Sequence, residues 1–244
     1  MELLLWITEH PVIAGTVLIL TIFTLYFTRY TNKQIKNIFL HYLDVETTSG
    51  LTGKEVAEKL LVANGLTNVR VGSIRGTLRD CYDDQEKVVL LSNQNYERSS
   101  LAGLAVAAHE IGHAIQDAEN YKLFKMRAKV IRFLMFLFKF KIQWVLLILG
   151  VVILFAFVDV GGLWWSFYVG IGMIAMGVFL PLLDILFPLV TLAVEVDASR
   201  RAMAQLTKLN LIREDEIPNV KKILNAAIWT YVASLLEFTF GMDM

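Results

Sequence analysis

The chain has 244 residues, of which 56% are hydrophobic and 19% are charged, and its formal net charge is zero. Ordinary soluble domains carry about 25% charged residues, so this composition is too apolar for a typical soluble domain. The charge balance gives no electrostatic reason to expect nucleic acid as a partner. The single cysteine, Cys81, excludes a disulfide within one chain and is compatible with a reducing compartment.

Three uncharged runs predict helices that cross a membrane, although a buried core helix is the alternative for each of them. They occupy residues 11–28, 142–158 and 163–183, and a membrane span needs roughly 17–25 apolar residues. Lys and Arg follow the first run, precede the second and follow the third, whereas the first ten residues and the segment 159–162 carry none. Basic residues favour the cytoplasmic side, so we expect residues 29–141 and 195–244 in the cytoplasm and the N-terminus outside.

The polar segment after the first run shows signals for short elements. Residues 50–65 predict an amphipathic helix in which Thr52 is the N-cap and Glu55 completes a capping box. Residues 69–92 predict a β-hairpin or small meander that ends with the strand Lys87–Leu91. Ser99 or Ser100 is then expected to cap a helix that runs to about Ala118. The basic and apolar segment 122–141 is typical of a helix at a membrane surface.

The helix that ends near Ala118 contains the motif His109-Glu110-Ile111-Gly112-His113. Residues i and i+4 lie on one helix face, so His109 and His113 can bind the same Zn²⁺. Glu110 can then act as the general base that takes a proton from a water activated by the metal. Gly112 lets this helix approach another element closely. The alternative is a pair of helical histidines with ordinary hydrogen bonds.

Catalytic zinc needs a third protein ligand, and the sequence offers three candidates for it. Glu195 is favoured because it follows a long uncharged run, where a carboxylate is costly unless it is bound or paired. Asp197 and His41 are the alternatives. If Glu195 is not a ligand, we expect it to pair with Arg200 or Arg201.

Three weaker hypotheses concern residues around this site. Asp117 either accepts a hydrogen bond from His113 or is a solvated carboxylate at the end of the helix. The strand Val88–Leu91 is a candidate edge for binding substrate as an added strand, or is purely structural. Tyr231 is a candidate donor for stabilising an oxyanion, although an interfacial role is favoured for it.

The predicted fold is therefore a mostly α membrane protein. It has about three transmembrane helices and a small α+β zincin-like cytoplasmic domain that carries the motif helix. The predicted organisation consists of an N-terminal anchor, a zincin-like domain, a transmembrane hairpin and a C-terminal helical segment that supplies the third ligand. These parts occupy residues 1–28, 29–141, 142–194 and 195–244, respectively.

Four blocks of this sequence resemble the bacterial membrane-bound neutral zinc metallopeptidases of the YugP-like family. In chain order they read SGLTGKEVA, GTLRDCYDDQEKVVLLS, AAHEIGHAIQDAENY and VEVDASRRA. The resemblance implies a gluzincin in which His109, His113 and Glu195 bind one catalytic Zn²⁺ and Glu110 is the general base. The last block is also similar to that of HtpX-type membrane proteases, in which aspartate takes the place of Ser199. Cys81 stands where the YugP-like family commonly has histidine.

Together these observations predict a membrane-bound zinc endopeptidase whose site lies at the cytoplasmic face of a bacterial plasma membrane. Its expected partners are a peptide or protein substrate, including membrane-associated ones, and the lipid bilayer, but not nucleic acid. The alternative is a catalytically silent scaffold or adaptor that keeps zinc for structure. The presence of Glu110 favours the enzyme. A transporter is disfavoured because only Asp184 places a charge near a predicted span.

Overall fold

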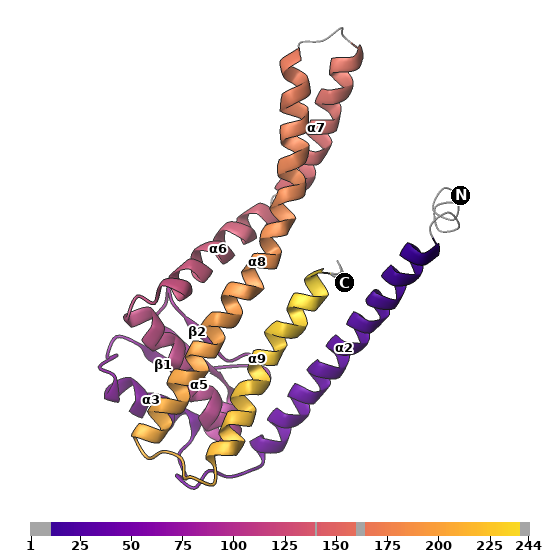
Figure 1. Cartoon of the computed structure of the whole chain (residues 1–244). Coiled ribbons are helices and arrows are strands. Elements are labelled where there is room, and N and C mark those ends of the chain that lie inside the picture. Colours follow the sequence, from indigo (N-terminus) through magenta and orange to yellow (C-terminus); the bar gives the residue numbers. More distant parts are fainter. Residues whose placement is uncertain (1–10, 140, 160–163, 240–244) are drawn as a thin grey trace. The chain divides into compact units, whose positions relative to one another are not determined.

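The computed structural model describes residues 11–139, 141–159 and 164–239 (Figure 1). The chain divides into two compact units, one formed by Met1–Phe124 with Leu192–Met244 and the other by Lys125–Thr191. It is mostly helical with one small sheet. The elements in chain order are α2 (Pro11–Leu43), α3 (Gly53–Ala63), β1 (Arg70–Ile74), β2 (Cys81–Asp83), β3 (Val88–Ser92), α4 (Asn93–Glu97), α5 (Leu101–Ala118), α6 (Lys122–Lys139), α7 (Ile142–Asp159), α8 (Trp164–Lys208) and α9 (Ile217–Thr239).

The prediction of about three membrane-crossing helices is wrong. In the part of the chain that the structure describes, no helix combines the length and the apolar content needed to cross a membrane. The second uncharged run lies in α7, for which the structure describes 18 residues. The other two uncharged runs are parts of longer helices, because α2 continues through Arg29 and Lys33 and α8 through Arg200 and Arg201. An uncharged run therefore does not mark the bounds of a helix, and the orientation inferred from Lys and Arg has no support in the structure.

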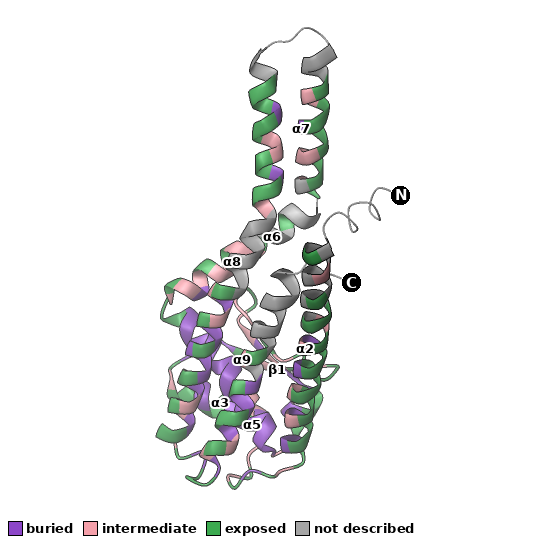
Figure 2. Ribbon diagram, turned by 45° about the vertical axis from the view of Figure 1, so that its right-hand side comes forward, coloured by how far each residue is buried: buried purple, intermediate pink, exposed green. Residues whose placement is uncertain are grey.

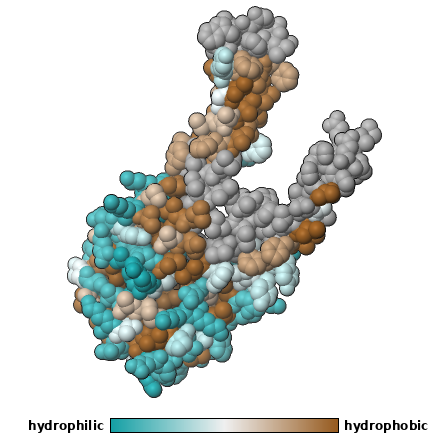
Figure 3. Space-filling model, viewed as in Figure 1, coloured by the Kyte–Doolittle hydropathy of each residue, from teal (hydrophilic) through white to brown (hydrophobic). Residues whose placement is uncertain are grey.

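The unit Lys125–Thr191 contains most of α6, all of α7 and the first part of α8. α7 and α8 approach each other closely at two glycines, since a Cβ added to Gly150 would lie 2.9 Å from the carbonyl oxygen of Gly170. Large apolar side chains of α7 and α8 remain exposed, among them Trp144, Ile148 and Tyr168. Figure 3 shows the apolar surface of this helix pair.

Local signals set the starts of α3 and α5 as predicted. Thr52 caps α3, and the full capping box is present because the side chain of Glu55 accepts from the backbone N–H of Thr52 at 2.8 Å. Ser100 caps α5 by accepting from the N–H of Gly103 at 3.0 Å, which selects Ser100 over Ser99. The predicted end of α5 at Ala118 is confirmed.

The sheet has three strands in the order β1-β3-β2. β2 and β3 form an antiparallel pair, as expected for a hairpin, but β1 pairs with β3 in parallel, with Arg70 opposite Val88. β3 is therefore the central strand, hydrogen-bonded on both sides. The prediction that Val88–Leu91 offers a free edge to substrate is wrong for this reason. The two edge strands of the sheet are β1 and β2.

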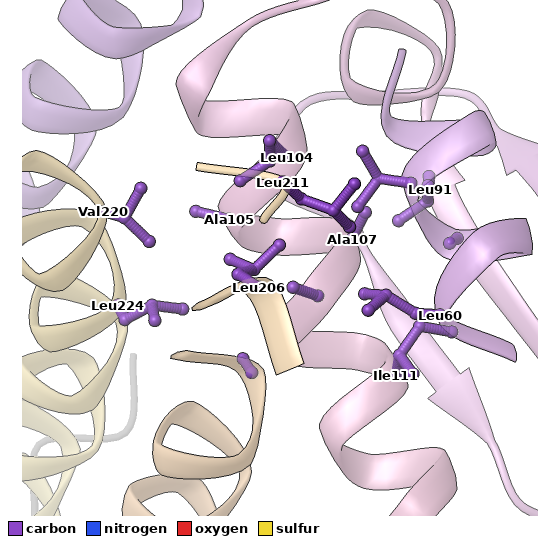
Figure 4. Packing of buried hydrophobic residues seen from close by; sticks show 14 of the residues in the cluster. Leu60, Leu91, Leu104, Ala105, Ala107, Ile111, Leu206, Leu211, Val220 and Leu224 are labelled. Atoms are coloured by element: carbon purple, nitrogen blue, oxygen red, sulfur yellow. The ribbon is translucent and has the colours of Figure 1, made fainter. Parts of the chain in front are cut away.

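α5 forms the centre of the larger unit and is buried along nearly all its length (Figure 2). The end of α8 packs against it, and Leu206 belongs to one apolar cluster with Leu104 and Leu60. Val220 and Leu224 of α9 extend toward these side chains (Figure 4). Burying one such side chain contributes about 1.5–3 kcal/mol to folding stability. The cluster therefore holds α5, α8 and α9 together.

Candidate metal centre

The structure brings together His109 and His113 of α5 and Glu195 of α8. The Nε2 atom of His109 lies 2.9 Å from Oε2 of Glu195, and the Nε2 atom of His113 lies 3.4 Å from the same oxygen. The three donor atoms all lie within 4.8 Å of one another, and all three residues are buried. Three donors from two helices thus converge on one point.

The close contact between α5 and α8 depends on Gly112. A Cβ at this position would lie 2.5 Å from the carbonyl oxygen of Ala198, where no side chain fits. Ala198 is three residues after Glu195 and therefore lies one turn away on the same face of α8. The glycine between the two motif histidines is thus what allows Glu195 to reach them.

The second nitrogen of each imidazole is also engaged. Nδ1 of His113 lies 3.0 Å from Oε1 of Gln116, and Nδ1 of His109 lies 3.1 Å from Oγ of Ser199. The amide of Gln116 is oriented unambiguously, because its Nε2 donates to the carbonyl oxygen of Val194 at 2.9 Å. Its Oε1 can then only accept, so Nδ1 of His113 carries the proton and its Nε2 presents a lone pair to the cluster.

Gln116 also links the motif helix to a charged group on α8. Its Nε2 donates to Oδ2 of Asp197 at 2.9 Å. Arg200 donates to the other oxygen of Asp197, and Arg201 donates to Oδ2 at 2.6 Å. The arginines that were expected to pair with Glu195 if it is not a ligand thus bind Asp197 instead.

The alternative third ligands lie outside the donor cluster. Asp197 binds Gln116 and the two arginines, and His41 lies on α2 with its ring 4.9 Å from that of Tyr42. Asp117 is neither a solvated carboxylate nor the partner found for Nδ1 of His113. It is buried and accepts from the hydroxyl of Tyr82 at 2.7 Å and from Lys87.

Glu110 is buried beside the donor cluster and lines the same cavity as His109 and Glu195. Burial raises the pKa of Glu110, an effect that the neighbouring histidines oppose. Burial alone would also raise the pKa of Glu195, yet the adjacent imidazoles of His113 and His109 hold it below its ordinary range. The pKa values of these two neighbouring carboxyl groups are therefore shifted in opposite directions. Such a difference is typical of sites in which one carboxyl group exchanges a proton and the other stays ionised.

Cys81 does not join the cluster. Its side chain is exposed, and the pKa of its thiol is raised by partial desolvation and by the nearby charges of Glu110, Asp83 and Asp80. A raised pKa keeps the thiol protonated, whereas a metal ligand must be a thiolate.

A cavity of about 210 Å³ opens onto the donors. Four of the described residues that line it are polar, and eight are apolar. The polar residues are Asp80, His109, Glu110 and Glu195, and the apolar ones are Ile35, Ile38, Phe39, Leu78, Val106, Ile223, Leu224 and Ala226. The cluster is thus reached from an apolar space lined in part by α2 and α9.

Sequence reasoning missed Gln116, Ser199 and the pairing of Arg201 with Asp197. A signal for Gln116 was available, because it stands three residues after His113 and so lies on the same helix face. Asp197 and Arg201 also offered one, because they are four residues apart on a helix. Ser199 carried no such signal, since its partner His109 is 90 residues away in the sequence. The side chains of Tyr231 and Asp184 lie outside the described part of the structure.

The donor set fits a zinc ion. Two imidazole nitrogens and one carboxylate oxygen are the three protein ligands of a His₂Glu catalytic zinc site, which keeps a fourth position open. The hydrogen bonds to both Nδ1 atoms supply the outer support that metal-binding histidines need. A helix with this motif, facing a glutamate on a second helix, defines the class of zinc-dependent hydrolases.

Comparison with known proteins gives the family. The family described as "Putative neutral zinc metallopeptidase" matches residues 17–241. A protein of Bacillus subtilis (strain 168), named "Putative membrane protease YugP", is 36% identical over 223 residues, which cover 91% of this chain and 92% of the relative. No solved structure matches the chain. The chain belongs to this family, which confirms the resemblance of its four sequence blocks and implies zinc as the metal.

Proposed function

We propose that the protein is a zinc-dependent endopeptidase in which His109, His113 and Glu195 hold one catalytic ion and Glu110 is the general base. The observation that carries the proposal is that both Nε2 atoms approach the same oxygen of Glu195, at 2.9 and 3.4 Å, in a buried position. When bound, zinc supplies a Lewis acid that lowers the pKa of water toward about 7 and polarises a carbonyl group.

Residues around the donor cluster orient the histidines and favour proton acceptance by Glu110. Gln116 holds the tautomer of His113, and the bond between Gln116 and Asp197 fixes α8 against the motif helix. Glu110 stands beside the ligands in a cavity with mostly apolar walls. Because burial raises its pKa, Glu110 is a better proton acceptor near neutral pH than an exposed glutamate would be.

We further propose that an extended substrate lies along β2. β2 is at one end of the strand order, and Asp80, which lines the cavity, directly precedes its first residue, Cys81. Adding a strand to a sheet edge would place consecutive substrate residues past Glu110 with main-chain hydrogen bonds that do not depend on their side chains.

The catalytic proposal is tested with Glu110→Gln, which removes the base and keeps the size of the side chain. We expect wild type and variant to bind equal amounts of zinc. The variant should cleave an unstructured protein such as casein at least 100-fold more slowly than the wild type. Zinc content is measured by atomic emission and cleavage by mass spectrometry. Stoichiometric zinc without cleavage by either protein, across several unfolded substrates, would favour the catalytically silent scaffold.

The ligand assignment is tested separately with Glu195→Ala. Loss of one of three ligands should abolish tight zinc binding at neutral pH, measured by competition with a chelator. Glu216→Ala is a matched control, because Glu216 is also a buried glutamate but bonds Thr48 at 2.7 Å and does not belong to the donor cluster. If Glu195→Ala retained stoichiometric, tight zinc, Glu195 would not be the third ligand.

We also propose that the protein works at a lipid membrane, as the name of the Bacillus subtilis relative indicates for that protein. The proposal is supported by the exposed apolar side chains of α7 and by the basic residues of α6, which include Lys125, Arg127 and Arg132. Flotation of the purified protein with phosphatidylglycerol vesicles should recover it with the lipid. Recovery in the lipid-free fraction at low salt would refute the proposal.

A further inference from the structure

We propose that the apolar cavity beside the donor cluster receives an apolar side chain of the substrate residue next to the cleaved bond, and so makes the enzyme selective for bulky apolar residues. This inference rests on the proposed function, because it assigns a specificity to the same site. Glu110 and Glu195 form part of the wall of the cavity. A group that fills the cavity is therefore held within reach of the reacting atoms.

The size of the cavity suits one side chain. At about 210 Å³ it is smaller than the 300–1,000 Å³ typical of pockets that bury a whole small ligand. Ile35 and Ile38 of α2 are only partly buried and border this space together with Val106 of α5 and Ile223 of α9. Three helices thus contribute branched aliphatic side chains that an apolar substrate group can contact.

The loop before β2 supplies one further apolar residue of the cavity wall, Leu78, at a conformational cost. Leu78 has a φ of +56° and is 45% exposed, which is unusual for a bulky residue. Such a backbone costs about 1–3 kcal/mol and persists where the surroundings fix it, often at binding sites. Asp80 fixes this loop, because its Oδ1 accepts from the N–H of Ser92 at 2.7 Å and from the amide of Asn95 at 3.0 Å. Leu78 thus lines the cavity two residues before this anchored position.

The charges around the cavity argue against charged substrate side chains. None of the described lining residues is Lys or Arg, so an acidic side chain would be buried beside three carboxylates without a counter-charge. A basic side chain would find two of those three carboxylates already engaged. Asp80 accepts from Ser92 and Asn95, and Glu195 is approached by both histidines.

The test measures binding, so that it does not depend on catalysis. N-acetylated glycine, leucine, lysine and aspartate hydroxamates are titrated into the zinc-loaded full-length protein by calorimetry, because the hydroxamate anchors each compound at the metal. We expect the leucine compound to bind about 10–200-fold more tightly than the glycine compound. The lysine and aspartate compounds should bind no better than glycine.

Substitutions in α2 test whether the preference for leucine arises from this cavity. Ile38→Trp fills the cavity and should remove the preference for leucine, whereas Leu40→Trp on the same helix should leave it unchanged, since Leu40 does not line the cavity. Ile38→Ala widens the cavity and should shift the optimum toward phenylalanine, which provides a second test if the tryptophan variant does not fold. Leu40→Ala is its matched control.

Equal affinities for glycine and leucine, a preference for a charged compound, or no binding of the leucine compound would each overturn the inference. Comparison with peptide cleavage separates it from the proposed function. A leucine preference in a protein that cleaves no peptide would uphold the cavity and refute the peptidase. A flat binding series in a protein that does cleave would uphold the peptidase and refute the cavity's role.

Discussion

Replacement of Gly112 by alanine should destabilise the protein and weaken zinc binding, although alanine is the better helix former. The new Cβ would lie 2.5 Å from the carbonyl oxygen of Ala198, about 0.9 Å closer than the 3.4 Å at which ordinary contact begins. This oxygen belongs to the backbone and cannot rotate aside, so α5 and α8 must move apart. Overpacking of this kind costs about 1–3 kcal/mol.

The expected net effect follows from two opposing contributions. Alanine gains about 1 kcal/mol in helix propensity over glycine, and we place the clash near the upper end of its range, so the net loss is about 2 kcal/mol. For a chain of this length that lowers Tm by about 4–8 °C. A movement of about 0.9 Å also exceeds the roughly 0.2 Å that metal–ligand distances tolerate, so zinc affinity should fall at least about tenfold.

A second helical glycine provides the control. Gly172 lies in α8 with no atom within 4 Å of an added Cβ, so Gly172→Ala should raise Tm by about 2–4 °C. Thermal unfolding is followed by circular dichroism, and zinc affinity by competition with a chelator. A Gly112→Ala variant that is as stable as Gly172→Ala and binds zinc as tightly as the wild type would contradict this prediction.

Two further predictions concern residues that support the site and its unit. Gln116→Leu should weaken zinc about 10–100-fold, because Nδ1 of His113 loses its partner; unchanged affinity in a chelator competition would show that Gln116 does not orient the ligand. Glu216→Gln should cost about 1.5–3 kcal/mol at pH 7, because the carboxylate accepts from the N–H and the hydroxyl of Thr48. Burial alone would raise the pKa of Glu216, but these bonds and the N–H of Arg213 hold it below its ordinary 4.5. Its contribution is therefore complete above pH 4.5 and is lost as the pH falls through the lower folded pKa, so a difference in urea midpoint that stays constant down to pH 2 would contradict the assignment.

Much of the local structure was predictable because neighbouring residues set it. The capping box of Thr52 and Glu55 requires only residues three positions apart, and so does the bond from Ser100 to Gly103 that starts α5. The spacing of His109 and His113 likewise places both on one helix face. The sheet was predicted less well, because the parallel pairing of β1 with β3 joins segments whose order along the chain does not reveal which strand is central.

The uncharged runs show a different limit of sequence reasoning. A run of apolar residues indicates that a segment avoids water, but it does not state where the helix that carries it begins or ends. α8 extends over 45 residues, from Trp164 to Lys208, and includes both an uncharged run and the glutamate of the candidate site. The prediction of membrane-crossing helices from such runs was wrong, because no helix in the described part of the chain is both long and apolar enough to cross a membrane.

The motif histidines can be read from the sequence alone, and so can the glutamate between them and a short set of candidates for the third donor. Glu195 and Asp197 are two residues apart and therefore point about 200° apart around one helix, so the sequence could not decide which of them faces the motif. The packing of α8 against α5 decides between them. The contact of Gly112 with Ala198 fixes the rotation of α8 against α5, which turns Glu195 toward the histidines, 86 residues from His109, and Asp197 toward Gln116 and Arg201.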